Sequence, residues 1–141
     1  MIRVYTASKL HMVPFWKGLE KEWDGLVYFH ARWLKHLELG IPETPENARR
    51  FWVEDLEDVS TSDAVMIYAD SPKDQLRGAL VEIGHAIANG KPIIVVGDHH
   101  SYGSWQYHPN GYNPYFPRYH FFIEWHDQQC RRQRRVQSEP V

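Results

Sequence analysis

The sequence predicts an α/β fold, in which one open parallel sheet carries helices on both faces. Residues 64–69 and 93–97 are short, continuously apolar runs, which are typical of central parallel strands buried on both faces. A segment with helical spacing separates them, and strand-like and helical segments alternate before them. This alternation predicts parallel strands that are joined by right-handed helical crossovers.

The N-terminal part predicts a strand, a helix and a second strand. Residues 2–7 are a β-rich opening run, and residues 13–23 have apolar side chains at helical spacing. Residues 26–30 predict the second strand. Residues 33–42 are mixed in character and are assigned to no element.

The next helix has a recognisable start. Thr44 is suited to cap its N-terminus, and Pro45 is suited to the first helical position. The helix is expected to end near Val59. After the two buried strands, residues 101–118 predict a long loop of functional character, and residues 119–125 predict a last strand.

The helix between the two buried strands contains one acidic residue in an otherwise apolar pattern. That residue is Glu82, and the helix ends at Gly90 and Pro92. The apolar stripe beside it consists of Leu80, Ile83 and Ile87. Helical side chains lean toward the N-terminus, so the carboxylate is expected to project over Gly78, which has no side chain. A carboxylate beside such a notch predicts a ligand site.

Length, charge and cysteine content narrow the class of protein. The 141 residues predict one domain over residues 1–125, followed by a polar, arginine-rich tail over residues 126–141. Cys130 is the single cysteine, which excludes an intrachain disulfide and favours a cytoplasmic location. A net charge of −2 gives no overall bias toward nucleic acid or membranes, and no apolar run is long enough to predict a membrane span. The aromatic content of 14% indicates a stacking pocket or a subunit interface.

Ligands of open parallel sheets bind outside the carboxyl ends of the strands. Residues 5–8, Asp70, the start of the Glu82 helix and residues 98–100 are all expected at that edge. Two carboxylates facing one cleft are the minimum equipment for cleaving a glycosidic bond with retention. The helix dipole is expected to keep Glu82 ionised as the nucleophile, which leaves Asp70 as the acid/base. The alternative is that Glu82 is a surface residue and Asp70 a turn residue.

Two other features have simpler interpretations. Asp98, His99 and His100 suggest a metal, but adjacent histidines in a strand point to opposite faces, so no metal is expected. Trp16 is either a core residue or a wall on which a base stacks.

Four segments together resemble the nucleoside 2-deoxyribosyltransferase family, within the superfamily that includes deoxynucleoside 5′-monophosphate N-glycosidases. They are Val-Tyr-Thr-Ala-Ser at 4–8, Asp-Ala-Val-Met-Ile-Tyr-Ala-Asp at 63–70, Gly-Ala-Leu-Val-Glu-Ile-Gly at 78–84, and Gly-Lys-Pro-Ile-Ile at 90–94. The resemblance covers about residues 1–97 in the order of the family. It implies a flavodoxin-like fold, a role in nucleotide salvage, no cofactor, and a homo-oligomer whose subunits complete each other's pocket.

The resemblance also implies residue roles. Glu82 stands at the glutamate that forms a covalent deoxyribosyl intermediate, Asp70 at the aspartate that interacts with the base, and Tyr5 at the tyrosine that positions the nucleophile. The implied reaction cleaves the N-glycosidic bond of a 2′-deoxyribonucleoside or its 5′-monophosphate and transfers deoxyribose to another nucleobase. If water is the acceptor, the protein is a hydrolase instead.

The chain departs from the family at the entrance to the Glu82 helix. Many members carry an aspartate or serine six residues before the nucleophile, where this chain has Leu76. Ser8, Lys9 and Arg77 are candidates for an anion pocket suited to a 5′-monophosphate, because arginine offers a planar fork of donors to phosphate oxygens. Ordinary surface positions are the alternative for these three residues. Leu76 also leaves open a protein that binds a nucleotide without turning it over.

Overall fold

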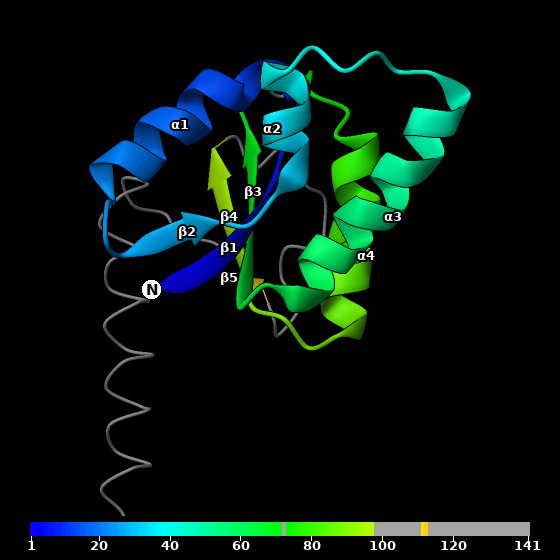
Figure 1. Ribbon diagram of the computed structural model, residues 1–141. Coiled ribbons are helices and arrows are strands. Elements are labelled where there is room, and N and C mark those ends of the chain that lie inside the picture. The colour runs from blue at the N-terminus through cyan, green and yellow to red at the C-terminus, as the bar shows by residue number, and fades with distance from the viewer. Residues whose placement is uncertain (72, 98–110, 113–141) are drawn as a thin grey trace, which may run out of the picture.

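A parallel sheet forms the centre of the molecule, and helices lie on its two sides (Figure 1). The structure is a computed structural model, and it describes residues 1–71, 73–97 and 111–112. The elements are β1 (Ile2–Ala7), η1 (Leu10–Met12), α1 (Val13–Glu22), β2 (Val27–Phe29), α2 (Arg32–Glu38), α3 (Pro45–Thr61), β3 (Ala64–Ala69), α4 (Arg77–Ala88), β4 (Ile93–Gly97) and β5 (Gly111–Tyr112).

The strand order is β2-β1-β3-β4-β5, and every pairing in the sheet is parallel. The two apolar runs of the sequence are β3 and β4, and nearly all of their residues are buried. The predicted parallel α/β sheet is therefore confirmed. Because parallel strands need long crossover connections, the helices that separate them in sequence cover the sheet.

Helices cover both faces of the sheet. Tyr5 on β1 is in register with Val65 on β3 and contacts Glu82 of α4. Tyr68 lies three residues beyond Val65 and so points to the other face, where Phe15 of α1 stacks on it with a centroid distance of 4.3 Å. α3 packs against α4 and α2.

Gly97 ends β4 with a positive φ of +90°. A Cβ atom at this position would lie 2.1 Å from the backbone oxygen of Ala69. Glycine is therefore required for the close approach of β3 and β4 at their carboxyl ends.

The start of α3 agrees with the prediction, whereas α2 was not predicted. The Thr44 side chain accepts a hydrogen bond from the backbone N–H of Asn47 at 3.1 Å, and Pro45 opens the helix. The first part of the unassigned segment 33–42 belongs to α2, where Trp33 is the buried residue. One buried position produces no periodic apolar stripe, so the helix is hard to recognise.

The expected loop at 101–118 contains β5, which pairs with β4. Its other residues, the expected last strand at 119–125 and the tail at 126–141 lie outside the described residues. Within the described part of the chain, no helix is long and apolar enough to cross a membrane.

Candidate active site

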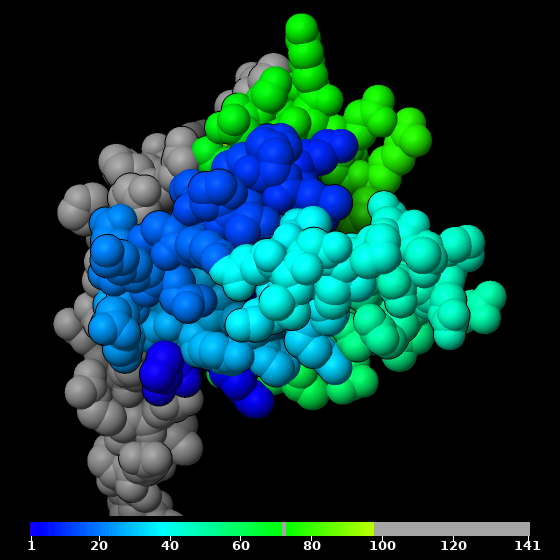
Figure 2. All heavy atoms as spheres, turned by 45° about the horizontal axis from the view of Figure 1, so that its top comes forward, coloured from blue at the N-terminus to red at the C-terminus, as the bar shows by residue number. Residues whose placement is uncertain are grey.

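A cavity of about 480 Å³ opens between the end of β1 and helices α2, α3 and α4. Figure 2 shows the η1 region (blue), the segment from α2 to α3 (cyan) and the entrance to α4 (green) next to one another on one face. These segments are far apart in sequence. The cavity is lined by Tyr5, Thr6, Ser8, Lys9, Leu10, Trp33, His36, Leu37, Ile41, Glu43, Ala48, Phe51, Trp52, Asp55, Gln75, Leu76, Arg77, Gly78, Ala79 and Glu82.

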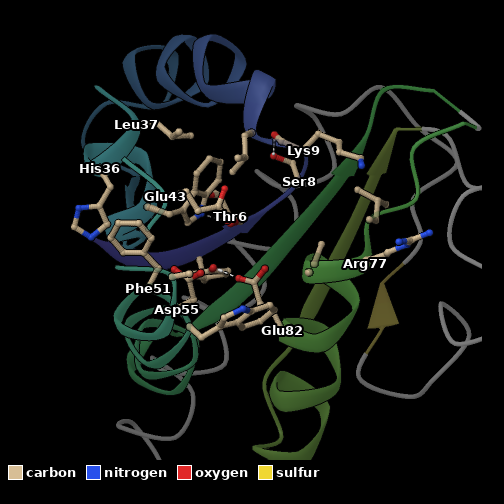
Figure 3. Close-up of a pocket in the computed structure, with 18 of the residues that line it drawn as sticks. Thr6, Ser8, Lys9, His36, Leu37, Glu43, Phe51, Asp55, Arg77 and Glu82 are labelled. Carbon is tan, nitrogen blue, oxygen red and sulfur yellow. Dashed lines mark hydrogen bonds between the residues drawn. The ribbon is translucent and has the colours of Figure 1, made fainter. Parts of the chain in front are cut away.

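Glu82 lies in the second turn of α4 and is only 8% exposed. Its Oε2 accepts a hydrogen bond from the hydroxyl of Tyr5, which is fully buried on β1 (Figure 3). Strand and helix therefore both hold the carboxyl group, and its remaining surface lines the cavity. The expectation that Tyr5 contacts Glu82 agrees with this geometry.

Burial raises the pKa of Glu82 to about 8. The group is therefore mainly protonated at neutral pH, contrary to the expectation that the helix dipole keeps it ionised. A helix dipole contributes about 0.3–1 kcal/mol. A rise of the pKa from 4.5 to about 8 corresponds to roughly 5 kcal/mol against the charged form, so desolvation dominates.

A second carboxyl group in the cavity wall was not anticipated from the sequence. It belongs to Asp55 on α3, and its pKa is raised to about 7 by burial and then by the nearby charges of Asp58 and Glu54. The sequence signal was present, because Phe51, Asp55 and Val59 are spaced by four and Val59 is fully buried. Asp55 thus occupies an inward-facing position, but its acidic neighbours made the segment resemble a solvated face.

The cavity has a cationic side and an aromatic side. Figure 3 shows Lys9 and Arg77 on the side opposite His36 and Phe51. The rings of His36 and Phe51 stack with a centroid distance of 4.7 Å. The Nε2 of His36 is hydrogen-bonded to Glu54 at 2.7 Å, whereas its buried Nδ1 has no hydrogen-bond partner among the described residues.

Ser8 and Gly78 line the cavity, each with a contact that the sequence did not predict. The hydroxyl of Ser8 accepts a hydrogen bond from Trp16 Nε1 at 2.8 Å and donates to the backbone oxygen of Lys9 at 2.9 Å. Beside Gly78, a Cβ atom would lie 3.8 Å from Trp52 on α3. The expected notch is therefore partly filled by an aromatic ring.

Two predicted site residues lie elsewhere. Asp70 is exposed at the end of β3, is not among the lining residues, and accepts a hydrogen bond from the Tyr68 hydroxyl at 3.2 Å. Asp74 accepts hydrogen bonds from the backbone N–H groups of Asp70 and Ser71, which ties the segment after β3 into a local turn. Trp16 is fully buried in the core, where it packs edge-on against Phe15, so it forms no wall of this cavity.

Leu76 is the N-cap residue of α4, and its backbone is in a left-handed conformation with φ 49° and ψ 33°. It is buried and lines the cavity. A bulky residue in this conformation is strained by roughly 1–2 kcal/mol, and such strain is concentrated at functional sites. The position at which the chain differs from the family that it resembles thus has an unusual backbone.

Among the described residues, no three histidine, cysteine, aspartate or glutamate side chains gather to hold a metal ion. Residues 98–100, the other candidates for a metal, lie outside the described part of the chain. No protein-family model matches the sequence, and no curated protein matches it either.

Proposed function

We propose that the protein cleaves the N-glycosidic bond of a 2′-deoxyribonucleoside or its 5′-monophosphate through a covalent glycosyl-Glu82 intermediate, with transfer of deoxyribose to another nucleobase. The observation that carries the proposal is the Tyr5–Glu82 hydrogen bond in the wall of a large cavity. These two residues stand where the resemblance places the nucleophile and its positioning tyrosine. The strand order β2-β1-β3-β4-β5 is also that of flavodoxin-like sheets.

The cavity has features that suit each part of a nucleotide. Lys9 and Arg77 offer donors for a phosphate, and Phe51 and Trp33 offer apolar surface for a base. Glu82 lies between these two sides (Figure 3), where the sugar would sit. The cationic side favours the 5′-monophosphate over the nucleoside.

The proposed first step requires ionised Glu82. The carboxylate attacks the anomeric carbon, and the bond to the base breaks as the ester forms. With a pKa of about 8, only about one Glu82 in ten is ionised at pH 7 in the free protein. The fraction of Glu82 that is able to attack should therefore rise with pH through about 8. The hydroxyl of Tyr5 stabilises the anion and holds it in line with its target.

Two alternatives remain open. Water in place of an acceptor base would make the protein a deoxynucleoside 5′-monophosphate hydrolase. The mainly protonated Glu82 and the apolar Leu76 favour a second candidate, a protein that binds a nucleotide without turning it over. The cytoplasm remains the expected location for any of these functions.

A homo-oligomer also remains part of the proposal. Apolar side chains are exposed on the neighbouring helices α3 and α4, namely Trp52, Val53, Leu80 and Val81. A second copy of the chain would cover this surface and border the cavity, because Trp52 belongs to both.

Chromatography of reaction mixtures tests the proposal. The protein is incubated with each deoxynucleoside and each 5′-monophosphate, with and without a free acceptor base, near pH 8. Base exchange that needs the acceptor supports a transferase, and base release without it supports a hydrolase. Tight binding without turnover supports the binding protein.

The intermediate is tested separately by mass spectrometry of quenched reactions. A deoxyribosyl adduct is expected on the peptide that contains residues 78–90, and it should be absent from Glu82→Gln. An adduct on any other peptide contradicts the assignment of the nucleophile.

A further inference from the structure

The acidic side chains of α3 differ in their partners. Glu54 bonds to His36, and Asp58 accepts hydrogen bonds from the backbone and side chain of Arg32. Glu57 forms an ion pair with Arg32 at 3.3 Å. Asp55 lies among them without a hydrogen bond or ion pair to any residue that the structure describes. A half-buried carboxyl group in this state has capacity left for a ligand.

Asp55 faces the same cavity as Glu82. The two residues come from different helices, α3 and α4, and Figure 3 shows both side chains directed into the cavity. Asp70, which the resemblance assigns to the departing base, lies outside the lining. Glu43 also lines the cavity but is exposed, so the two carboxyl residues that the cavity wall removes at least partly from water are Asp55 and Glu82.

We infer that Asp55 is the proton donor and acceptor of the reaction, and that it takes the role which the sequence assigned to Asp70. This inference rests on the proposed function, since it needs a base to leave and an acceptor to arrive. The two reacting carboxyl groups then come from α3 and α4, which form the cavity wall, and none comes from the segment that follows β3.

The proton balance closes over the two steps. Ionised Glu82 attacks the anomeric carbon, the bond to the base breaks, and the electron pair goes to the base. Protonated Asp55 supplies the proton that makes the base a neutral leaving group. In the second step ionised Asp55 takes a proton from water, or from the incoming base, as it attacks the anomeric carbon. The ester breaks, and both carboxyl groups return to their starting states.

The surroundings of Asp55 suit both halves of this cycle. Burial is the largest influence and favours the protonated form, and Glu54 and Asp58 on the same helix act in the same direction. His36 and Arg32 of α2 act against them and favour the ionised form. Glu82, Glu43, Lys9 and Arg77 are the other charged groups that line the cavity. These opposing influences hold the pKa of Asp55 at about 7, near the working pH of a general acid.

A pair of substrates tests the role. The first is the deoxynucleotide that the wild-type protein cleaves fastest, and the second has the same sugar and a better leaving base. An N7-methylated base serves for a purine and a 5-fluorinated base for a pyrimidine, because both depart with less need for a proton donor. Asp55→Asn should lower kcat about 10²–10⁴-fold on the first substrate and only a few-fold on the second.

The comparison variants separate this role from others. Glu82→Gln should abolish turnover of both substrates. Glu57→Gln removes an exposed carboxylate from the same helix and should retain wild-type rates on both. Circular dichroism and thermal unfolding establish that each variant is folded.

A pH profile of the wild-type protein tests the role without any substitution. With the ordinary base, the rate should rise to a maximum between about pH 7 and 8, because Glu82 must be ionised, and fall above it, because Asp55 loses its proton. With the better leaving base, that fall should be absent.

Three outcomes would overturn the inference. If Asp55→Asn is normal while Asp70→Asn is inactive, the proton donor is Asp70, and the proposed function still stands. If Asp55→Asn loses the same factor on both substrates and both pH profiles coincide, Asp55 is a structural residue. If the wild-type protein cleaves no deoxynucleoside or deoxynucleotide, the proposed function fails and the role of Asp55 fails with it.

Discussion

Carboxyl groups lie both in the walls of the cavity and at the carboxyl end of β3, but they differ in their exposure to water. In the walls, Glu82 is almost fully buried and Asp55 is half-buried, and burial raises the pKa of both. At the end of β3, Asp70 is exposed and accepts a hydrogen bond from Tyr68. Helix packing removes Asp55 and Glu82 from water, and this burial is the largest cause of their raised pKa values. Burial between helices, rather than a position at the carboxyl end of a strand, therefore identifies the carboxyl groups that are candidates for acid–base chemistry.

The largest expected effect is on the pH dependence of stability. The folded-state pKa of Glu82 lies above its ordinary value of 4.5, so the folded protein binds more protons than the unfolded chain between about pH 4.5 and 8. This group therefore makes the free energy of unfolding fall as pH rises through that window, by up to about 4 kcal/mol. Glu82→Gln should remove this part of the slope and be more stable than the wild type at about pH 8.5.

Urea unfolding at several pH values measures this slope. Asp70→Asn is the control from the exposed region, and it should change the stability by less than about 0.5 kcal/mol, as surface substitutions usually do. An unchanged slope in Glu82→Gln would show that folding does not raise the pKa of Glu82.

The same substitution in the two regions should affect catalysis very differently. Tyr5→Phe removes the donor to Glu82, and Tyr68→Phe removes the donor to Asp70. We expect kcat of Tyr5→Phe to fall about 10²-fold, close to 3 kcal/mol, because the buried anion loses its hydrogen bond. The rising limb of its pH–rate profile should also move to higher pH. Tyr68→Phe should stay within a few-fold of the wild type; equal losses in both variants would contradict the contrast.

The comparison of buried and exposed segments also explains which features of the structure could be predicted from the sequence. Buried parallel strands are continuous apolar runs, so β3 and β4 could be predicted from residues 64–69 and 93–97. Glu82 could be recognised because it is the one acidic residue in an otherwise apolar helical segment. Both features depend on burial within one segment of the chain, and such burial leaves a pattern of apolar residues in the sequence.

Other features could not be predicted because no local pattern in the sequence reveals them. Most of them depend on packing between distant segments. Asp55 faces the cavity only because α3 packs against both α2 and α4. Asp70 was placed at the site because parallel strands end at one edge, and the pattern of strands does not reveal the local turn that Asp74 forms after β3. The raised pKa of Glu82 likewise follows from what covers the helix, and neither spacing nor charge pattern reports it.

A smaller effect is expected from the cationic side of the cavity. Arg77→Gln should raise KM for a deoxynucleoside 5′-monophosphate about tenfold, near 1.4 kcal/mol, and leave KM for the nucleoside nearly unchanged. Lys73→Gln removes an exposed cation beside the end of β3, outside the cavity, and should change neither value. Steady-state kinetics on both substrates measure the selectivity. Equal effects of the two substitutions would place the phosphate elsewhere.

The smallest expected effect concerns Leu76, where the chain passes from the open end of β3 into the cavity wall. In an ordinary helical position alanine is more stable than glycine by about 1 kcal/mol, and Leu80 in α4 should follow that rule. At Leu76 the left-handed backbone should reverse it, because glycine adopts a positive φ without strain. Both substitutions lose the buried side chain, so their difference isolates the backbone. We expect urea unfolding to find Leu76→Gly more stable than Leu76→Ala by about 1 kcal/mol, and the opposite order at Leu80; the same order at both positions would mean that the entrance to α4 is unstrained.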